Sequence, residues 1–208
     1  MIISTINLKG GVGKTTSAIA LATAAARDGK DVELYDCDPQ SSASLWAMVA
    51  ADNGDPLPFP VTSANIATVR VAGKKLKETD DKWLFIDCPP SGHIMDEAMK
   101  SSDFVVVPTT TGPADMVKTF ETAETLSDRG LFYAVLLTRV IARTLTLKQS
   151  LSELDDRNVN YFDNQIPSRE GLKNFFGNSF GDDLFGYEAV YEELKQAMRE
   201  DDVIRYDG

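Results

Sequence analysis

The chain has 208 residues, of which 43% are apolar and 25% charged, and its formal net charge is −11. This composition excludes a disordered, fibrous or coiled-coil chain, and the length favours one domain, 1–208, that buries a core without metal or disulfide support. The acidity argues against a generally basic nucleic-acid binder, although a local basic patch can exist on an acidic protein.

The N-terminal sequence and the small number of cysteines bear on the cellular compartment of the protein. The N-terminus lacks the basic and apolar segments of a signal peptide, and no run approaches the roughly 18 apolar residues of a membrane span. Cys37 and Cys88 are too few for a disulfide framework and are expected to be small buried residues. We therefore expect a cytoplasmic protein without membrane attachment.

Short apolar runs alternate with longer helical segments along the chain. In order, we expect a strand at 2–8, a helix at 14–28, a strand at 32–37, a helix at 41–51 with Ser41 as N-cap, a loop at 52–60, a short strand at 61–62 and a helix at 65–79. There follow a strand at 83–88, a helix at 95–101, a strand at 104–108, a helix at 114–128, a strand at 132–138, a helix at 146–156, a short strand at 159–162 and a helix at 188–199. The segment 171–187 holds four phenylalanines and few helix formers, which predicts a loop with weak helical pieces.

Strands separated by helices indicate βαβ units. The longer strand candidates are nearly continuous apolar runs, which is typical of strands covered by helices on both faces. We therefore expect an α/β fold with a doubly wound, mostly parallel sheet.

The strongest motif is K-G-G-V-G-K-T-T at 9–16, between a strand and a helix. Glycines let successive N–H groups point at phosphate oxygens, and the helix N-terminus adds positive potential. Lys14 is expected to reach the β- and γ-phosphates and Thr15 to place its hydroxyl on Mg²⁺. The strict P-loop pattern needs glycine at position 8, where this chain has Leu8. The alternative is a glycine-rich turn beside lysines. The residues expected to bind the nucleotide here are Lys9, Gly10, Gly11, Val12, Gly13, Lys14, Thr15 and Thr16.

With its extra lysine, this loop resembles the deviant Walker A loop of the ParA/MinD superfamily of P-loop ATPases. The length and later motifs are similar to those of the small plasmid-partition ParA (ParF-like) proteins, up to about Pro167. The resemblance implies that Lys9 reaches the phosphates of a partner subunit in an ATP-dependent homodimer, where its charge would act like an arginine finger. The alternative is an exposed lysine beside a turn.

Two aspartates end the strand predicted at 32–37. Carboxylates at the C-terminal ends of parallel strands lie at the ligand edge of such a sheet, and alternation places Asp36 and Asp38 on the same side. One could orient the attacking water and the other support Mg²⁺. The resemblance gives Asp38 the water-facing role, which makes Lys9, Lys14 and Asp38 the candidate catalytic residues. The alternative is an ordinary Asp-Pro turn.

A third aspartate, Asp87, ends the apolar strand at 83–88 and is followed by two prolines. This is the Walker B pattern, so the metal candidates are Thr15, Asp38 and Asp87. The next residues resemble the switch II segment of the family. In this segment lies His93, the only histidine, which we interpret as solvated rather than catalytic or metal-binding.

Two later segments follow strands. The resemblance places 138–139 and 166–169 beside the adenine, which makes Thr138 and Pro167 candidate contacts to the nucleotide. Thr138 stands where the family leads us to expect asparagine. The alternative is a pair of ordinary loops at strand ends.

Two stretches are locally basic and contain no acidic residue. Clustered lysines and arginines can bind DNA phosphates without reading sequence, although solvated helix faces have the same composition. The first-choice residues, in 137–152, are Arg139, Arg143 and Lys148. The stretch 56–77 also contains Arg70, and its second-choice residues are Lys74, Lys75 and Lys77. The acidic C-terminal segment 181–208 is unlike the basic amphipathic membrane helix of the MinD branch.

The leading hypothesis is therefore an ATPase that uses ATP and Mg²⁺, dimerises on ATP, binds DNA non-specifically and partitions plasmid or chromosomal DNA. The resemblance implies a centromere-binding ParB-type partner, association with the nucleoid and slow hydrolysis that the partner stimulates. One alternative is a metabolic P-loop enzyme such as an amide-forming ligase. Another is a nucleotide-binding regulator without hydrolysis, against which Asp38 and Asp87 argue. Cys37 and Cys88 lie inside the nucleotide motifs, which argues against an iron–sulfur cluster.

Overall fold

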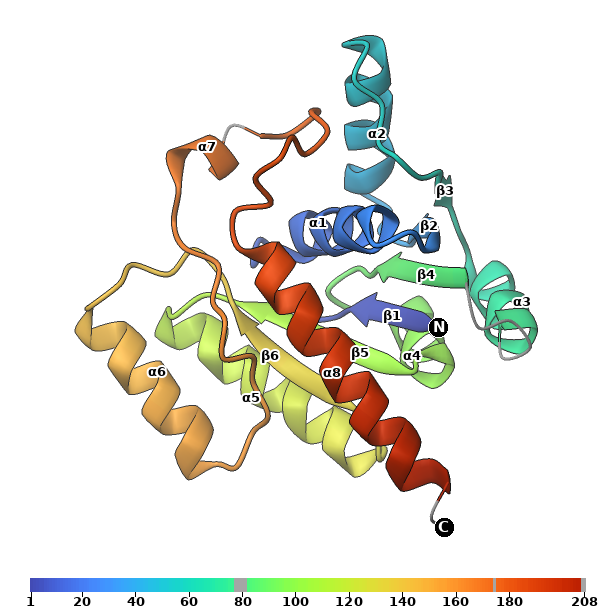
Figure 1. Ribbon diagram of the computed structural model, residues 1–208. Helices are drawn as coiled ribbons and strands as arrows, with labels where there is room; N and C mark the ends of the chain where they lie inside the picture. Colours follow the sequence, from blue (N-terminus) through green and yellow to red (C-terminus); the bar gives the residue numbers. More distant parts are fainter. Residues whose placement is uncertain (77–81, 174, 207–208) are drawn as a thin grey trace.

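The computed structural model describes residues 1–76, 82–173 and 175–206, shown in Figure 1. The strands are β1 (Ile2–Thr5), β2 (Asp31–Asp36), β3 (Val61–Ser63), β4 (Lys82–Asp87), β5 (Phe104–Thr109) and β6 (Tyr133–Leu137). The helices are α1 (Lys14–Arg27), α2 (Ser42–Asp52), α3 (Ile66–Lys75), α4 (His93–Ser101), α5 (Pro113–Asp128), α6 (Leu145–Asp156), α7 (Glu170–Lys173) and α8 (Tyr187–Tyr206).

The six strands form one sheet in the order β3-β2-β4-β1-β5-β6, and every pairing is parallel. The central strand β1 lies between β4 and β5, so that Thr5 is opposite Asp87 on one side and Val106 on the other. Because the strands are parallel, their C-terminal ends meet at one edge of the sheet. The predicted α/β fold with a doubly wound parallel sheet is confirmed.

Alternate strand residues pack on opposite faces. Ile3 and Phe85 face the layer that contains α1, α2 and α8, whereas Ile2 and Ile86 face the layer of α3, α4, α5 and α6. Figure 1 shows α1 and α8 crossing one face of the sheet, with α4 and α5 behind it. Both faces of the sheet are thereby buried, which explains the continuous apolar character of its strands.

Helix α1 is rich in alanine because α8 packs closely on it. Its alanines at 18, 20, 22, 24 and 25 are buried. Buried residues of α8 recur at 187, 190, 191, 194 and 198, the spacing of one helical face. The hydroxyl oxygens of Ser17 and Tyr187 lie 3.0 Å apart, which ties the starts of the two helices together.

Some predicted elements differ from the structure. The short strand predicted at 159–162 is only an isolated bridge, between Val135 and Tyr161. The helix predicted at 65–79 begins at Ile66 and ends at Lys75, and residues 77–79 lie outside the described part. The last helix is longer than the predicted 188–199.

Ser41 is the N-cap residue of α2, as predicted, but its side chain does not cap the helix. Ser41 has a φ of 51° and its side chain makes no capping hydrogen bond. The Oδ2 atom of Asp36 instead accepts hydrogen bonds from the backbone N–H of Ser44 (2.8 Å) and from its hydroxyl (2.7 Å). A carboxylate from the preceding strand therefore caps α2, because it lies at the positive end of the helix.

Candidate functional site

The loop between β1 and α1 is open for a ligand. Gly11 and Gly13 have φ values of 76° and 97°, which favour glycine. A Cβ atom added to Gly10 or Gly11 would meet no atom within 4 Å, so the backbone there is bare on its outer side. Below the loop, Asn7 accepts a 2.9 Å hydrogen bond from the N–H of Lys9. The loop therefore presents backbone donors at the N-terminus of α1, as an anion site requires.

Lys14 lies inside this loop. Its side chain is buried, and its Nζ donates a 3.0 Å hydrogen bond to the carbonyl oxygen of Lys9. Burial lowers the pKa of Lys14, while the charges of Asp87 and Asp38 oppose that shift. The ammonium group is thus poorly solvated, a state in which an added phosphate would interact with it strongly.

Asp87 is a buried carboxylate with one oxygen that has no hydrogen-bond partner among the described residues. It is 1% exposed, and its Oδ1 lies 3.5 Å from the hydroxyl of Thr5. Its Oδ2 is buried without a hydrogen-bond partner in the described part of the chain. Burial raises the pKa of Asp87 to about 7, although a hydrogen bond from the Thr15 hydroxyl and the charge of Lys14 both lower it. An unpaired buried carboxylate oxygen beside a threonine hydroxyl is a donor set that suits a hard divalent cation such as Mg²⁺.

The two aspartates that follow β2 differ in position. Asp36 is buried, caps α2 as described above and accepts a 3.2 Å hydrogen bond from the N–H of Asp38 through Oδ1. Asp38 is partly exposed, and its Oδ1 accepts from the N–H of Gln40. Only Asp38 of this pair lines the cleft described next. The predicted shared orientation toward a ligand therefore does not hold for Asp36, whose carboxylate turns toward α2 to cap it.

Two adjoining clefts lie above the loop. The first, of about 620 Å³, is the loop cleft, and its wall includes Lys14, Thr15 and Asp38. The second, of about 400 Å³, is the Pro167 cleft, and its wall includes Thr138 and Pro167. The residues common to both are Gly13, Thr16, Trp46, Arg139 and Phe176. The clefts are therefore continuous and together form an elongated site, as a nucleoside triphosphate would need.

Thr138 and Pro167 are brought together, since Val140 and Pro167 form a parallel bridge. The hydroxyl of Thr138 lies 2.9 Å from the carbonyl oxygen of Val12 and 3.0 Å from that of Thr109. Its single hydrogen therefore serves a backbone acceptor, so that Thr138 lines the Pro167 cleft with its hydroxyl proton already engaged.

The candidate DNA-binding residues separate into two groups. Arg139 has a φ of 53° and lines both clefts. Arg143 and Lys148 are exposed, line neither cleft and make no ion pair within the described residues. All three residues are exposed, but Arg139 lines both clefts, whereas Arg143 and Lys148 lie outside them.

The second-choice basic patch is partly neutralised. Arg70 makes two 2.9 Å hydrogen bonds to Glu97, which lower the pKa of that carboxyl. Lys74 and Lys75 are exposed at the end of α3, and Lys77 lies outside the described residues.

Several cleft residues have no local sequence signal. Trp46, Phe176 and Tyr187 line the site although they follow no nucleotide-binding motif. The cluster of phenylalanines at 171–187 was the one available indication of an unusual segment. His93 begins α4 and is exposed, in agreement with its interpretation as a solvated residue.

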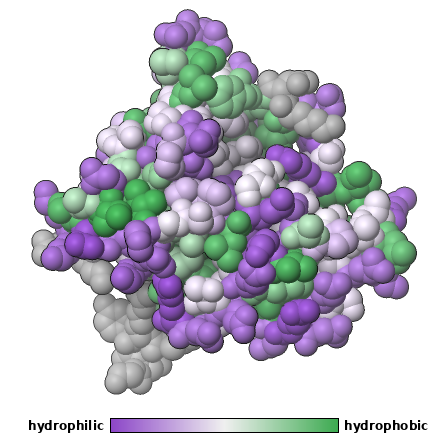
Figure 2. Space-filling model, turned by 180° about the vertical axis from the view of Figure 1, so that it is seen from behind, coloured by the Kyte–Doolittle hydropathy of each residue, from purple (hydrophilic) through white to green (hydrophobic). Residues whose placement is uncertain are grey.

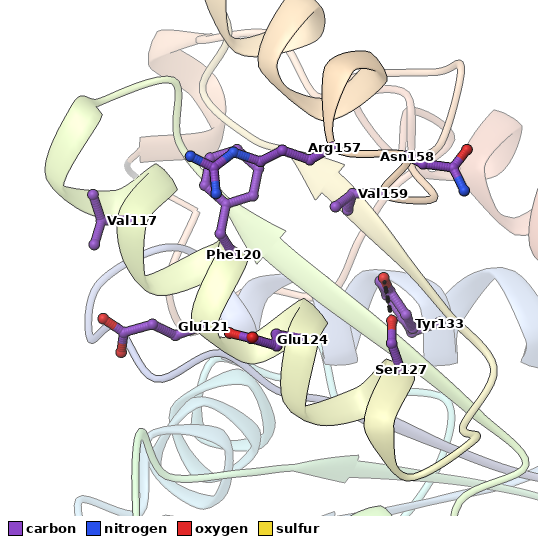
Figure 3. Close-up of a pocket in the computed structure, with 9 residues that line it drawn as sticks. All are labelled: Val117, Phe120, Glu121, Glu124, Ser127, Tyr133, Arg157, Asn158 and Val159. Carbon is purple, nitrogen blue, oxygen red and sulfur yellow. Dashed lines mark hydrogen bonds between the residues drawn. The ribbon is translucent and has the colours of Figure 1, made fainter.

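A further hollow of about 440 Å³ lies away from these clefts, between α5 and the turn after α6 (Figure 3). There the guanidinium of Arg157 lies over the ring of Phe120, 4.2 Å from its centroid, and the hydroxyls of Ser127 and Tyr133 are 3.0 Å apart. This hollow contains none of the predicted site residues.

The back of the molecule carries only small apolar patches among polar residues (Figure 2). None of the helices in the described ranges combines the length and the apolar character needed to cross a lipid bilayer.

Several known proteins resemble this chain in sequence. The family model described as the CobQ/CobB/MinD/ParA nucleotide binding domain matches residues 3–178. The chain is 32% identical over 185 residues to the chromosome-partitioning ATPase Soj of Thermus thermophilus, covering 73% of this chain and 74% of that protein. It is 35% identical over 149 residues to the maintenance of carboxysome distribution protein A of Gloeobacter kilaueensis, covering 69% of this chain and 65%, just under two thirds, of that protein.

Solved structures with a similar fold cover nearly the whole chain. A putative plasmid partition protein of Borrelia burgdorferi, solved bound to AMPPNP, superposes with a TM-score of 0.71 at 21% identity, covering 96% of this chain and 98% of that one. At this identity the likeness concerns the fold.

Proposed function

Because the chain belongs to the CobQ/CobB/MinD/ParA nucleotide-binding family, we propose that it is a ParA-type partition ATPase. In this proposal it binds ATP with Mg²⁺, forms a homodimer on ATP, binds DNA non-specifically on the nucleoid and is stimulated by a centromere-binding ParB-type protein. Hydrolysis to ADP and phosphate returns the monomer and releases the DNA.

One observation carries the catalytic part. The buried Oδ2 atom of Asp87 has no hydrogen-bond partner in the described chain, and it lies at the end of β4 near a buried Lys14. An orphaned buried acceptor is costly, so a native chain retains one where a ligand satisfies it. Mg²⁺ held by Thr15 and Asp87 would supply charge neutralisation for the triphosphate.

The remaining residues of the loop cleft have distinct roles in this proposal. Lys14 and the N–H groups of 10–16 bind the phosphates. Asp38, partly exposed at the wall of the cleft, orients the attacking water and accepts its proton. Asp36 holds α2 and the backbone of Asp38 in place rather than binding the nucleotide.

Dimerisation is assigned to Lys9 and DNA binding to exposed cations. The Lys9 side chain is 42% exposed beside the loop, so it can reach a partner subunit. Arg143 and Lys148 from two protomers would contact DNA phosphates, which is why we expect little sequence preference and a strong salt dependence.

The test combines hydrolysis with DNA co-sedimentation in ATP, in ADP and without nucleotide. Lys14→Ala should abolish ATP binding and every ATP-dependent step. Asp38→Ala should keep ATP-dependent dimerisation and DNA binding but lose hydrolysis by roughly 100-fold or more, the usual range for a general base. Hydrolysis by Asp38→Ala at the wild-type rate would overturn the role of Asp38.

The DNA surface has its own variants. Arg143→Glu with Lys148→Glu should lose DNA binding and keep ATP-dependent dimerisation. The matched control is Lys30→Glu with Lys118→Glu, which changes the net charge equally elsewhere on the surface. If unmodified protein with ATP binds no DNA but hydrolyses ATP, a metabolic ATP-dependent enzyme of the same family becomes the better hypothesis.

A further inference from the structure

Trp46 of α2 and Phe176 of the phenylalanine-rich segment together form an aromatic wall of the candidate nucleotide site. Trp46 of α2 is 3% exposed, whereas Phe176 is 46% exposed, and their ring centroids lie 5.3 Å apart. Both rings line the loop cleft and the Pro167 cleft. Phe176 is thus a large apolar side chain that is left half uncovered where the two clefts join.

The backbone that carries Phe176 is fastened to α2. Trp46 donates from Nε1 to the carbonyl oxygen of Asn178 (2.8 Å), and Asn53 donates from Nδ2 to that of Gly177 (3.2 Å). Gly177 has a φ of 77°, and a Cβ atom there would lie 2.4 Å from Cγ1 of Val49. These contacts fix the backbone next to Phe176 against α2, so the ring of Phe176 is preorganised at the cleft wall.

The Pro167 cleft is suited to a flat, mostly apolar group. Its walls include Ile166, Pro167 and Phe176, and no carboxylate or carboxamide side chain is among its described lining residues. The hydroxyl of Thr138 is already bonded to backbone carbonyls. A ligand group in this cleft would contact apolar faces and the guanidinium groups of Arg139 and Arg169, and no side-chain amide among the described residues lines the cleft to read its edge.

We propose that Phe176 is the stacking wall for the nucleotide base, with the triphosphate extending from it along the loop cleft toward Lys14. This proposal rests on the proposed nucleotide-binding function. Aromatic stacking on a base is sequence-tolerant because every base has a π face. Phe176 thereby increases the affinity for a ligand that carries a base. It lies in the segment 171–187, outside the P-loop motif.

Calorimetry with Mg²⁺ and two ligands tests this: ATP, and inorganic tripolyphosphate, which has the phosphates but no base. Phe176→Leu keeps an apolar contact to Trp46 and removes the ring. It should weaken ATP binding roughly tenfold, the scale of one base–aromatic stack, and leave tripolyphosphate binding unchanged. Phe176→Tyr retains the ring and should bind ATP as the unmodified chain does.

The matched control is Phe120→Leu, which removes a ring from the separate hollow of Figure 3 and should alter neither affinity. Thermal unfolding of Phe176→Leu checks that it folds. An unchanged ATP affinity in Phe176→Leu, or an equal loss for tripolyphosphate, overturns the proposal while nucleotide binding stands. Failure of the unmodified chain to bind either ligand overturns the proposed function and this proposal with it.

Discussion

The ammonium group of Lys9 lies 3.8 Å from Oδ1 of Asp115, in the first turn of α5. The other carboxylate oxygen of Asp115 accepts a 2.7 Å hydrogen bond from the hydroxyl of Thr110, which fixes its orientation. The lysine that we assign to the partner's phosphates is therefore paired within its own chain, and dimerisation must break that pair.

This pair predicts opposite effects of two substitutions on ATP-dependent dimerisation. Lys9→Ala should weaken the dimer about tenfold or more while changing the affinity for ATP by less than about threefold. Asp115→Asn removes the competing carboxylate from both subunits and should tighten the dimer by up to about 25-fold, since each of the two exposed pairs is worth at most about 1 kcal/mol. Sedimentation velocity with ATP and Mg²⁺ measures both. A dimer that forms equally with and without ATP would contradict the hypothesis.

The buried carboxyl of Asp87 predicts a pH dependence of stability in the absence of nucleotide and Mg²⁺. Its pKa is about 7 in the folded chain and near the ordinary 3.8 in the unfolded chain. Between these pH values the carboxyl is protonated in the folded chain and ionised in the unfolded chain. The free energy of unfolding therefore falls as pH rises, and the contribution of this proton is gone above about pH 7. The resulting loss in the free energy of unfolding between about pH 4 and pH 8 is on the order of 4 kcal/mol.

Asp87→Asn should therefore stabilise the ligand-free protein at pH 8 and change its stability little at pH 4. Urea unfolding of both proteins across this range measures the difference, which isolates Asp87 from other titrating groups. A constant difference between pH 4 and pH 8 would show that the carboxyl ionises normally. The same variant should lose Mg²⁺-dependent ATP binding.

The cap on α2 predicts that Asp36 and Asp38 differ in kind. Asp36→Ala leaves the N–H groups of Ser44 and Asp38 without their acceptor and should reduce the free energy of unfolding by about 2–3 kcal/mol. Asp38→Ala, at a partly exposed position, should reduce it by less than about 1 kcal/mol. Ser44→Ala removes only the hydroxyl and should be intermediate. Chemical denaturation of the three variants ranks them, and equal stability of the two aspartate variants would contradict the assignment.

Gly177 predicts a stability effect that involves α2. Gly177→Ala adds a Cβ atom 2.4 Å from Val49 at a φ of 77°, so both steric contact and backbone strain should destabilise the protein, by about 1–3 kcal/mol. In the Val49→Ala background the steric part should become smaller, because Cγ1 is gone while Cβ of residue 49 stays at 3.0 Å, and the backbone strain should remain. A double-mutant cycle measures this coupling. Strict additivity of the two substitutions would mean that the segment moves away from α2 freely.

Much of the fold and the loop could be predicted from the sequence because the responsible interactions are local. The alternation of apolar strands with helices sets the parallel sheet, since each strand must bury both faces. Lys14 and Thr15 follow directly on the glycines, so their place at the helix N-terminus depends on a few successive backbone angles. Asp87 ends an apolar strand, and parallel pairing alone brings it to the edge where β1 ends.

Only the tertiary structure decided what Asp36, Arg139 and Phe176 do. Asp36 turns from the ligand edge because the start of α2 offers unpaired N–H groups to a carboxylate there. Arg139, although exposed, lines both clefts because the residue after β6, Thr138, bonds to Val12 of the loop. Phe176 reaches Trp46 across 130 positions of the chain, through contacts with no period or spacing in the sequence. Such long-range packing is set by the shape of the assembled core, and a local pattern cannot record it.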